Sequence, residues 1–117
     1  MRPRGTATTA RAGVVGVRIA YGALLLLVPR TALPTDAEDG VGTVVARVLG
    51  ARHVAQGLGA AVLPRWVTPA RSALVDATHA ATMLGWAVLD ARRRRQALVN
   101  AATACLLAVA EIRVAPA

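Results

Sequence analysis

The sequence has no phenylalanine, no lysine and a single cysteine, and only 3% of its residues are aromatic. With one cysteine, neither an internal disulfide nor a CxxC redox or zinc motif can form. A soluble core in a chain of 117 residues normally draws much of its buried area from large aromatic side chains. Here 56% of the residues are hydrophobic, mostly alanine, valine and leucine. Small aliphatic residues in this proportion are typical of helices that pack closely within a lipid bilayer.

Acidic residues are also scarce. The chain contains six of them and 14 arginines, which gives a net charge of +8. A basic chain commonly binds nucleic acid, but such a surface gathers its basic side chains on one face. The arginines instead lie in the N-terminal segment and beside the ends of apolar segments, as at Arg30, Arg71 and 92–95. This distribution is typical of a membrane protein. We therefore expect a lipid bilayer and its anionic headgroups as partners, and no nucleic acid.

Prolines and charged residues divide the apolar sequence into four helical segments. Pro29 and Pro64 end the first two, Asp90 follows the third, and Thr68 before Pro69 is a helix-start signal. The sequence predicts a disordered basic tail over residues 1–12 and a four-helix membrane domain over residues 13–113. The helices are expected at about 13–28, 41–63, 69–89 and 96–112.

Length and polarity favour membrane-spanning helices over a soluble four-helix bundle. A bilayer core requires about 20 residues per helix, and a soluble bundle requires a charged face on each helix. Residues 73–88 contain only Asp76 and His79 as ionisable groups. The predicted fold class is all-α, a four-helix transmembrane bundle, located as a multi-pass protein in the cell membrane. The orientation and the full span of the second helix stay open, since the loop arginines divide almost equally between the two sides.

The second and third helices carry polar residues that a membrane interior accommodates at a cost unless they are paired. If these helices form an antiparallel hairpin around Trp66, residues equally distant from the turn lie at the same depth. Arg52 and Asp76 are then close enough to form an ion pair. The predicted polar cluster consists of Arg52, His53, Gln56, Asp76 and His79. A second possible ion pair joins Arg18 of the first helix to Glu111 of the last.

Three interpretations of this cluster stay open. The first is a structural role, in which the cluster holds the two helices of the hairpin together. The second is a functional role as a proton or ion relay or as a polar ligand site. The third is a metal or haem site. In the third case His53 and His79 are the candidate ligands. The nearby Arg52 would repel a cation, so we expect no cofactor and no metal.

Small residues recur every four positions on two helices, at Ala77, Ala81 and Gly85 and at Gly57 and Ala61. This spacing favours close packing inside the bundle over contacts in a dimer. Cys105 lies in an apolar run and is interpreted as a small buried residue. No nucleophile–base pair and no glycine-rich phosphate loop is present, so we expect no enzyme activity.

Residues 49–56 (LGARHVAQ) and 75–84 (VDATHAATML) resemble segments of a group of small actinobacterial membrane proteins. More distantly, the chain resembles the DoxX-like four-helix membrane families. The resemblance implies a four-helix bundle without an assigned activity, and it includes the same five residues of the polar cluster. Small multidrug transporters share the length and number of spans, but they typically carry a glutamate in the first helix, where this chain has Arg18.

The sequence favours a non-enzymatic structural or accessory membrane protein, either a homo-oligomer or part of a larger membrane complex. One alternative is a small transporter or proton-coupled carrier that uses Arg52, Asp76 and His79. Another is a membrane redox protein that holds haem or quinone between the second and third helices.

Overall fold

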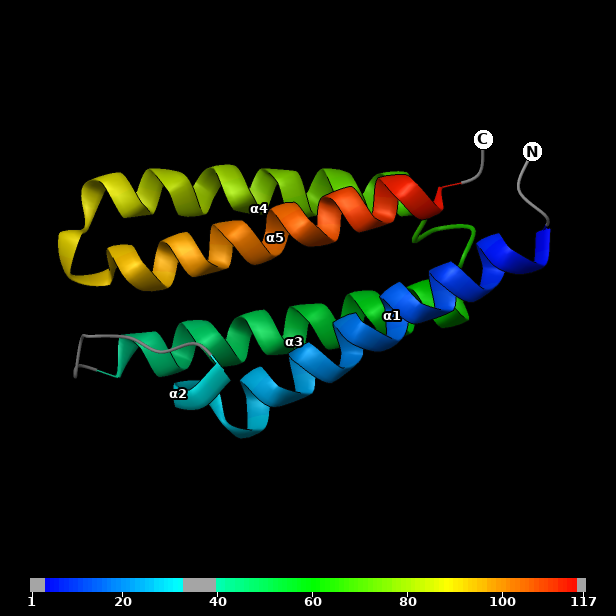
Figure 1. Cartoon of the computed structure of the whole chain (residues 1–117). Helices are drawn as coiled ribbons and strands as arrows, with labels where there is room; N and C mark the ends of the chain where they lie inside the picture. The colour runs from blue at the N-terminus through cyan, green and yellow to red at the C-terminus, as the bar shows by residue number, and fades with distance from the viewer. Residues whose placement is uncertain (1–3, 33–39, 116–117) are drawn as a thin grey trace.

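The computed structural model describes residues 4–32 and 40–115, and these ranges contain helices and no strand (Figure 1). The fold is therefore all-α, as predicted. Four long helices account for most of it, with one short α-helix and one 3-10 turn between them. In chain order the elements are α1 (Arg4–Leu27), α2 (Pro29–Ala32), α3 (Val41–Val62), α4 (Pro69–Leu89), η1 (Ala91–Arg93) and α5 (Arg94–Val114).

Helix α1 begins at Arg4, well before the predicted start at residue 13. The prediction of a disordered tail is therefore corrected for residues 4–12, while residues 1–3 lie outside the described ranges. The polar composition of this segment suggested disorder, but a tertiary contact holds the helix there. Arg11 donates a hydrogen bond from Nη2 to the carbonyl oxygen of Val67, 2.8 Å away. This bond ties the beginning of α1 to the turn between α3 and α4.

The other predicted boundaries lie close to those of the structure. Helix α3 ends at Val62, α4 covers Pro69–Leu89, and α5 extends the predicted 96–112 segment to Arg94–Val114. Thr68 caps α4, because its side chain accepts a hydrogen bond from the backbone N–H of Arg71 at 3.3 Å. Gly40 precedes α3 with φ of 79°, a left-handed conformation that glycine adopts without steric cost.

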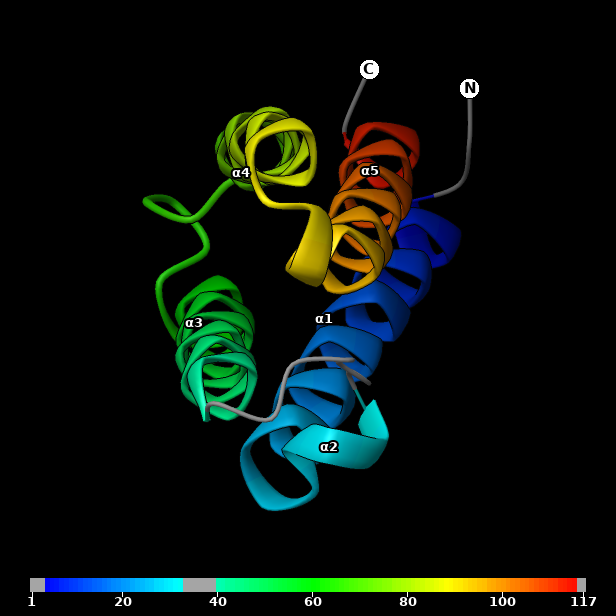
Figure 2. The same ribbon diagram turned by 90° about the vertical axis from the view of Figure 1, so that its left-hand side faces the viewer.

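The long helices form two packed pairs, α1 with α3 and α4 with α5, and α1 also packs against α5. The view along the bundle in Figure 2 shows the two pairs as two layers. The predicted hairpin of α3 and α4 is present, because the two helices run antiparallel around residues 63–68 and Arg52 meets Asp76 across them (Figure 1). The two helices nevertheless lie in different layers, and their backbones make few close approaches. The connection through residues 63–68 leads from one layer to the other.

Glycines allow the backbones of α1 and α3 to approach closely. A Cβ atom on Gly50 would lie 2.6 Å from the carbonyl oxygen of Gly22, and one on Gly22 would lie 2.8 Å from that of Gly50. A Cβ atom on Gly57 would lie 2.6 Å from Cγ1 of Ile19. Gly57 is thus used for internal packing, as predicted, but against α1 rather than against α4. Leu25 and Leu49 fill the adjoining core.

Alanines form the contact between α4 and α5. On α4 the buried alanines recur every seven residues, at positions 73, 80 and 87. On α5 Ala97, Ala101, Ala104 and Ala108 are buried along one face. Small side chains at this spacing let two helices pack with a narrow separation. Ala77, Ala81 and Gly85 lie on the exposed side of α4, so the prediction that they pack internally is corrected.

The outer surface of the bundle is rich in large apolar side chains. Leu27, Val88 and Leu89 are 79%, 77% and 87% exposed, and Leu106 is 71% exposed. Cys105 is also exposed, which corrects its interpretation as a buried residue. By length and hydropathy, two segments of the described chain are able to cross a membrane, Thr8–Leu27 and Ala91–Val114. Hydropathy alone thus supports two spans, whereas the sequence prediction was four.

Candidate functional site

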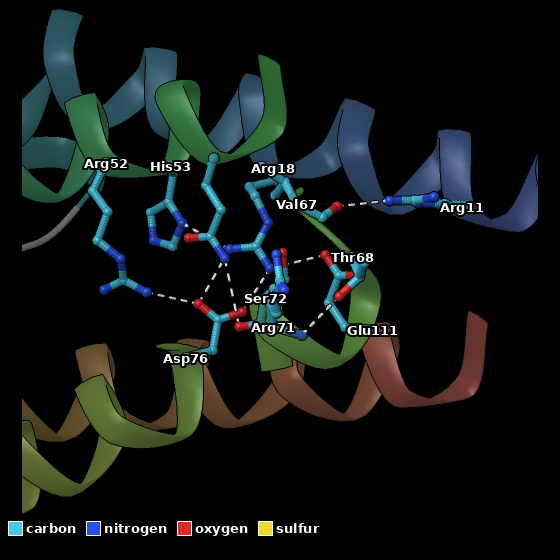
Figure 3. A network of polar contacts seen from close by, with 11 residues as sticks. Arg11, Arg18, Arg52, His53, Val67, Thr68, Arg71, Ser72, Asp76 and Glu111 are labelled. Atoms are coloured by element: carbon cyan, nitrogen blue, oxygen red, sulfur yellow. Dashed lines mark hydrogen bonds and ion pairs between the residues drawn. The ribbon is translucent and has the colours of Figure 1, made fainter. Parts of the chain in front are cut away.

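A network of buried ionic side chains lies where the two helix layers meet (Figure 3). Its centre is Asp76 of α4, which is fully buried. Arg18 of α1 donates to both carboxylate oxygens, from Nη2 to Oδ2 at 2.6 Å and from Nη1 to Oδ1 at 3.2 Å. Arg52 of α3 donates from Nη2 to Oδ1 at 2.7 Å. The structure therefore brings Arg52 and Asp76 together, as the sequence predicts.

Arg18 connects this centre to α5. Its Nη2 atom lies 3.2 Å from Oε1 of Glu111, so the expected Arg18–Glu111 pair is also present. The sequence predicts this pair as separate from the polar cluster, whereas the structure joins it to Asp76 through the same guanidinium. Arg18 is only 1% exposed, and it contacts side chains from α3, α4 and α5. One arginine of α1 therefore links all four long helices.

The charges of the network alternate in the order Glu111, Arg18, Asp76, Arg52. Two carboxylates and two guanidiniums compensate one another, which lowers the cost of burying them. The exposure of the four is uneven. The side chains of Arg18, Asp76 and Glu111 are at most 4% exposed, whereas that of Arg52 is 24% exposed. The network is therefore closed at its glutamate end and partly open at its Arg52 end.

His53 of α3 contacts Arg18 of the network through a ring nitrogen and Tyr21 through its ring. Its Nδ1 atom lies 3.4 Å from Nη1 of Arg18. Because a guanidinium has only donors, this contact requires Nδ1 to act as the acceptor, which places the ring proton on Nε2. The His53 ring also meets the ring of Tyr21 edge-on, with centroids 5.4 Å apart. The Nδ1 lone pair is thus already engaged, which argues against His53 as a metal ligand through that atom.

Gln56 and His79, the other two predicted cluster residues, lie beside the network without joining its ion pairs. Gln56 donates from Nε2 to the carbonyl oxygen of Ser72 at 3.5 Å. His79 interacts with the side chain of Asn100 on α5. Among the described residues, Oε1 of Gln56, Nε2 of His79 and Nε of Arg52 are buried without a hydrogen-bond partner.

Sequence reasoning missed two further buried polar residues on α5. Gln96 is fully buried and donates from Nε2 to the carbonyl oxygen of Gly42 at 3.0 Å, and Asn100 is 3% exposed. Their spacing contains the signal that could have revealed them. Gln96, Asn100 and Glu111 fall on the same helical face as the buried Ala104 and Leu107, with steps of three or four residues.

The arrangement provides hydrogen bonding and charge compensation between helices. The described residues contain no group of three or more histidine, cysteine, aspartate or glutamate side chains placed to hold a metal ion. The described network also presents no nucleophile next to a general base. Arg52 and His79 are the polar residues of the predicted cluster that line an open cavity, of about 470 Å³, together with Leu74, Val75, Thr78 and Thr82.

The resemblance to small actinobacterial and DoxX-like membrane proteins stays a prediction. Comparison of the chain with protein-family models, with curated proteins and with solved structures finds no match.

Proposed function

We propose that this chain is a multi-pass membrane protein in which all four long helices cross the bilayer, and that it acts as a structural or accessory subunit without enzyme activity. The observation that carries this proposal is the inverted distribution of side chains. Charged residues such as Arg18 and Asp76 are buried between helices, while leucines and valines on every long helix face outward. Such an apolar surface is costly in water and favourable in lipid.

The same distribution explains why only two helices pass a test of length and hydropathy. Arg52 and His53 lower the hydropathy of α3, and Asp76 and His79 lower that of α4. These side chains point into the bundle or into the cavity between α3 and α4, so they leave the outer faces of both helices apolar. A helix of 21 residues is about 31 Å long, close to the ~30 Å thickness of a bilayer core. Both α4 and α5 have this length.

The network supports a structural role because its charges satisfy one another. Arg18 donates a hydrogen bond to each carboxylate oxygen of Asp76. A bidentate ion pair of this kind is expected where two helix layers are held together. Breaking such a buried pair is strongly destabilising, since it leaves a charge without compensation. The partners on this proposal are the lipid bilayer with its anionic headgroups and either further copies of the chain or a larger membrane complex.

A small carrier is a second candidate, and the cavity beside Arg52 favours it. A polar site that stays partly open, in a bundle with an apolar exterior, is the arrangement that binding during transport requires. In this case Arg52, Asp76 and His79 would take part in the transport cycle. A haem- or quinone-binding redox protein is a third candidate with His79 at the same cavity.

Purification from the native membrane tests the accessory role. Membranes are washed with alkaline carbonate, solubilised in mild detergent, and the tagged protein is isolated for mass spectrometry and an absorption spectrum. We expect the chain to stay in the washed membrane and to elute with a partner protein in constant ratio. A tagged, unrelated four-helix membrane protein of similar abundance controls for passive co-purification. A homogeneous self-assembly would identify further copies of the chain as the partner and exclude a subunit of a larger complex, and visible absorbance would support the redox candidate.

A further inference from the structure

The space between α3 and α4 is a groove with polar and apolar walls. Two neighbouring cavities lie there, and Val75 lines both. The larger, of about 470 Å³, contains Arg52 and His79, and the smaller, of about 280 Å³, lies near Trp66 and Gln56. The groove exists because α3 and α4 belong to different layers and pack sparsely against each other. If the four helices span the bilayer, as proposed above, its mouth opens toward lipid.

The charge order of the network makes the groove attractive to an anion. Along Glu111, Arg18, Asp76 and Arg52 the signs alternate, and the series ends on the guanidinium that lines the groove. Both oxygens of Asp76 are engaged by Arg18, so this carboxylate is shared by two cations. Nε of Arg52 and Nε2 of His79 are buried without partners among the described residues, while the Arg52 side chain as a whole is 24% exposed. An anion bound beside Arg52 would continue the alternation of negative and positive charges.

The aliphatic walls of the groove indicate that the anionic group of the ligand is attached to a hydrocarbon chain. Leu74 is 67% exposed and Val75 is 48% exposed, and both face the cavity. Two further polar residues of the wall, Thr78 and Thr82, already donate their hydroxyl protons to backbone carbonyl oxygens of α4. The donor left for the occupant is thus the partly exposed guanidinium of Arg52, while the rest of its surface contacts aliphatic side chains.

We propose that the α3/α4 groove binds an amphipathic anion, with its carboxylate or comparable single anionic headgroup on Arg52 and its hydrocarbon chain along Leu74 and Val75. A free fatty acid and the headgroup of an anionic lipid share this chemistry. This site is distinct from the buried ion pair between Arg18 and Asp76, because its occupant contacts the partly exposed guanidinium of Arg52.

Binding of decanoate to the full chain in phosphatidylcholine nanodiscs tests the proposal, with decanol as a neutral ligand of equal chain length. We expect saturable binding of decanoate, and binding of decanol weaker by at least about tenfold, the loss of one charge-assisted hydrogen bond. R52Q should weaken decanoate binding to the level of decanol. R47Q is the matched control, because Arg47 lies on the same helix and lines a different cavity with Val28 and Thr43.

A second variant separates loss of the site from loss of the fold. V75W places an indole in the groove while it leaves Arg52 and the buried network unchanged, so binding should fall and the melting temperature should stay. Nanodiscs that contain phosphatidylglycerol distinguish the two sources of the anion: competition with decanoate assigns the site to a lipid headgroup, and unchanged binding assigns it to a free acid. Equal affinities for decanoate and decanol, or wild-type binding by folded R52Q or V75W, would overturn the proposal. Membrane integration is measured independently by carbonate extraction, so a failure of the span proposal is recognised separately.

Discussion

At the scale of single residues, Arg18 has the largest number of roles. It is the only ionisable residue between Arg11 and Arg30 other than Tyr21, and Glu111, its predicted partner, lies 93 residues away in the sequence. In the structure it donates to Asp76 with two nitrogens and also contacts Glu111 and His53. Its position in a buried, compensated network follows from the high cost of an unpaired charge in an apolar interior.

Replacement of Asp76 by asparagine should destabilise the protein strongly. The substitution removes the charge between Arg18 and Arg52 and leaves two guanidiniums close together in the bundle. Breaking a buried pair in this way typically costs about 3–5 kcal/mol. We expect a correspondingly lower free energy of unfolding, measured by denaturation of the detergent-solubilised protein.

Asp90→Asn is the matched control for this variant. Asp90 also accepts from an arginine, Nη1 of Arg93 at 2.7 Å, but this pair lies at a helix end and is partly exposed. An exposed pair contributes about 1 kcal/mol or less, so D90N should remain close to wild type. If D76N unfolds at the same denaturant concentration as D90N, the ionic network does not stabilise the contact between the two helix layers. A double-mutant cycle with R52A and D76A then measures how much of the loss is shared by the pair.

At the scale of helices, the two pairs in the bundle use different small residues for the same purpose. Helices α1 and α3 approach through Gly22, Gly50 and Gly57, whereas α4 and α5 approach through alanines. Glycine is required where backbone faces backbone, because a Cβ atom has no room there. On α4 and α5 the buried alanines supply the small side chains of the contact.

Gly50→Ala should weaken the contact between α1 and α3. The added Cβ would lie 2.6 Å from a backbone oxygen of Gly22, so the helices must separate. Overpacking of this kind typically costs about 1–3 kcal/mol. Gly16→Ala in α1 is the control, since no described atom lies within 4 Å of the new Cβ, and alanine is the better helix former. Thermal melting in detergent should therefore fall for G50A and stay or rise for G16A. The opposite order would contradict the close approach of the two backbones.

At the scale of the whole molecule, the proposal that four helices cross the membrane makes a prediction about topology. The bundle measures 48 Å along its longest axis, and its helices lie roughly along that axis (Figure 1). With four spans, the N-terminus and the turn at residues 63–68 lie on one side, and the η1 turn lies on the other. With only α1 and α5 as spans, the turn at 63–68 and the η1 turn lie on the same side.

Single cysteines at three positions distinguish these topologies. In a Cys105→Ser background, Gly5→Cys, Arg65→Cys and Arg92→Cys each place one thiol at an exposed position. A membrane-impermeant maleimide added to intact cells or inverted vesicles reports the side on which each thiol lies. We expect positions 5 and 65 to react from one side and position 92 from the other. Reaction of positions 65 and 92 from the same side would establish two spans and contradict the proposed topology.

The sequence was sufficient to predict the helices and the residue types of the site, since these depend on local signals. Prolines and the Thr68–Pro69 pair marked helix ends, and the α4 boundaries agree with the structure. Charges inside an apolar helix bundle must find partners, and with an antiparallel arrangement of 41–63 and 69–89 this was enough to predict pairs for Arg52 with Asp76 and for Arg18 with Glu111. The start of α1 was not accessible in this way, because the bond from Arg11 to Val67 joins segments far apart in the chain.

Only the tertiary structure decided which helices are neighbours and how the polar residues are divided among them. Among the long helices, both α1 and α4 are neighbours of α3 in the chain, yet α3 packs closely on α1 alone, because the glycines of α1 and α3 let their backbones approach. That choice places Arg18 between Asp76 and Glu111 and merges two predicted pairs into one network. It also leaves α3 and α4 apart, which leaves Arg52 and His79 beside an open groove. Composition determined that these charges must be compensated, and the geometry of the helix layers determined by which partners.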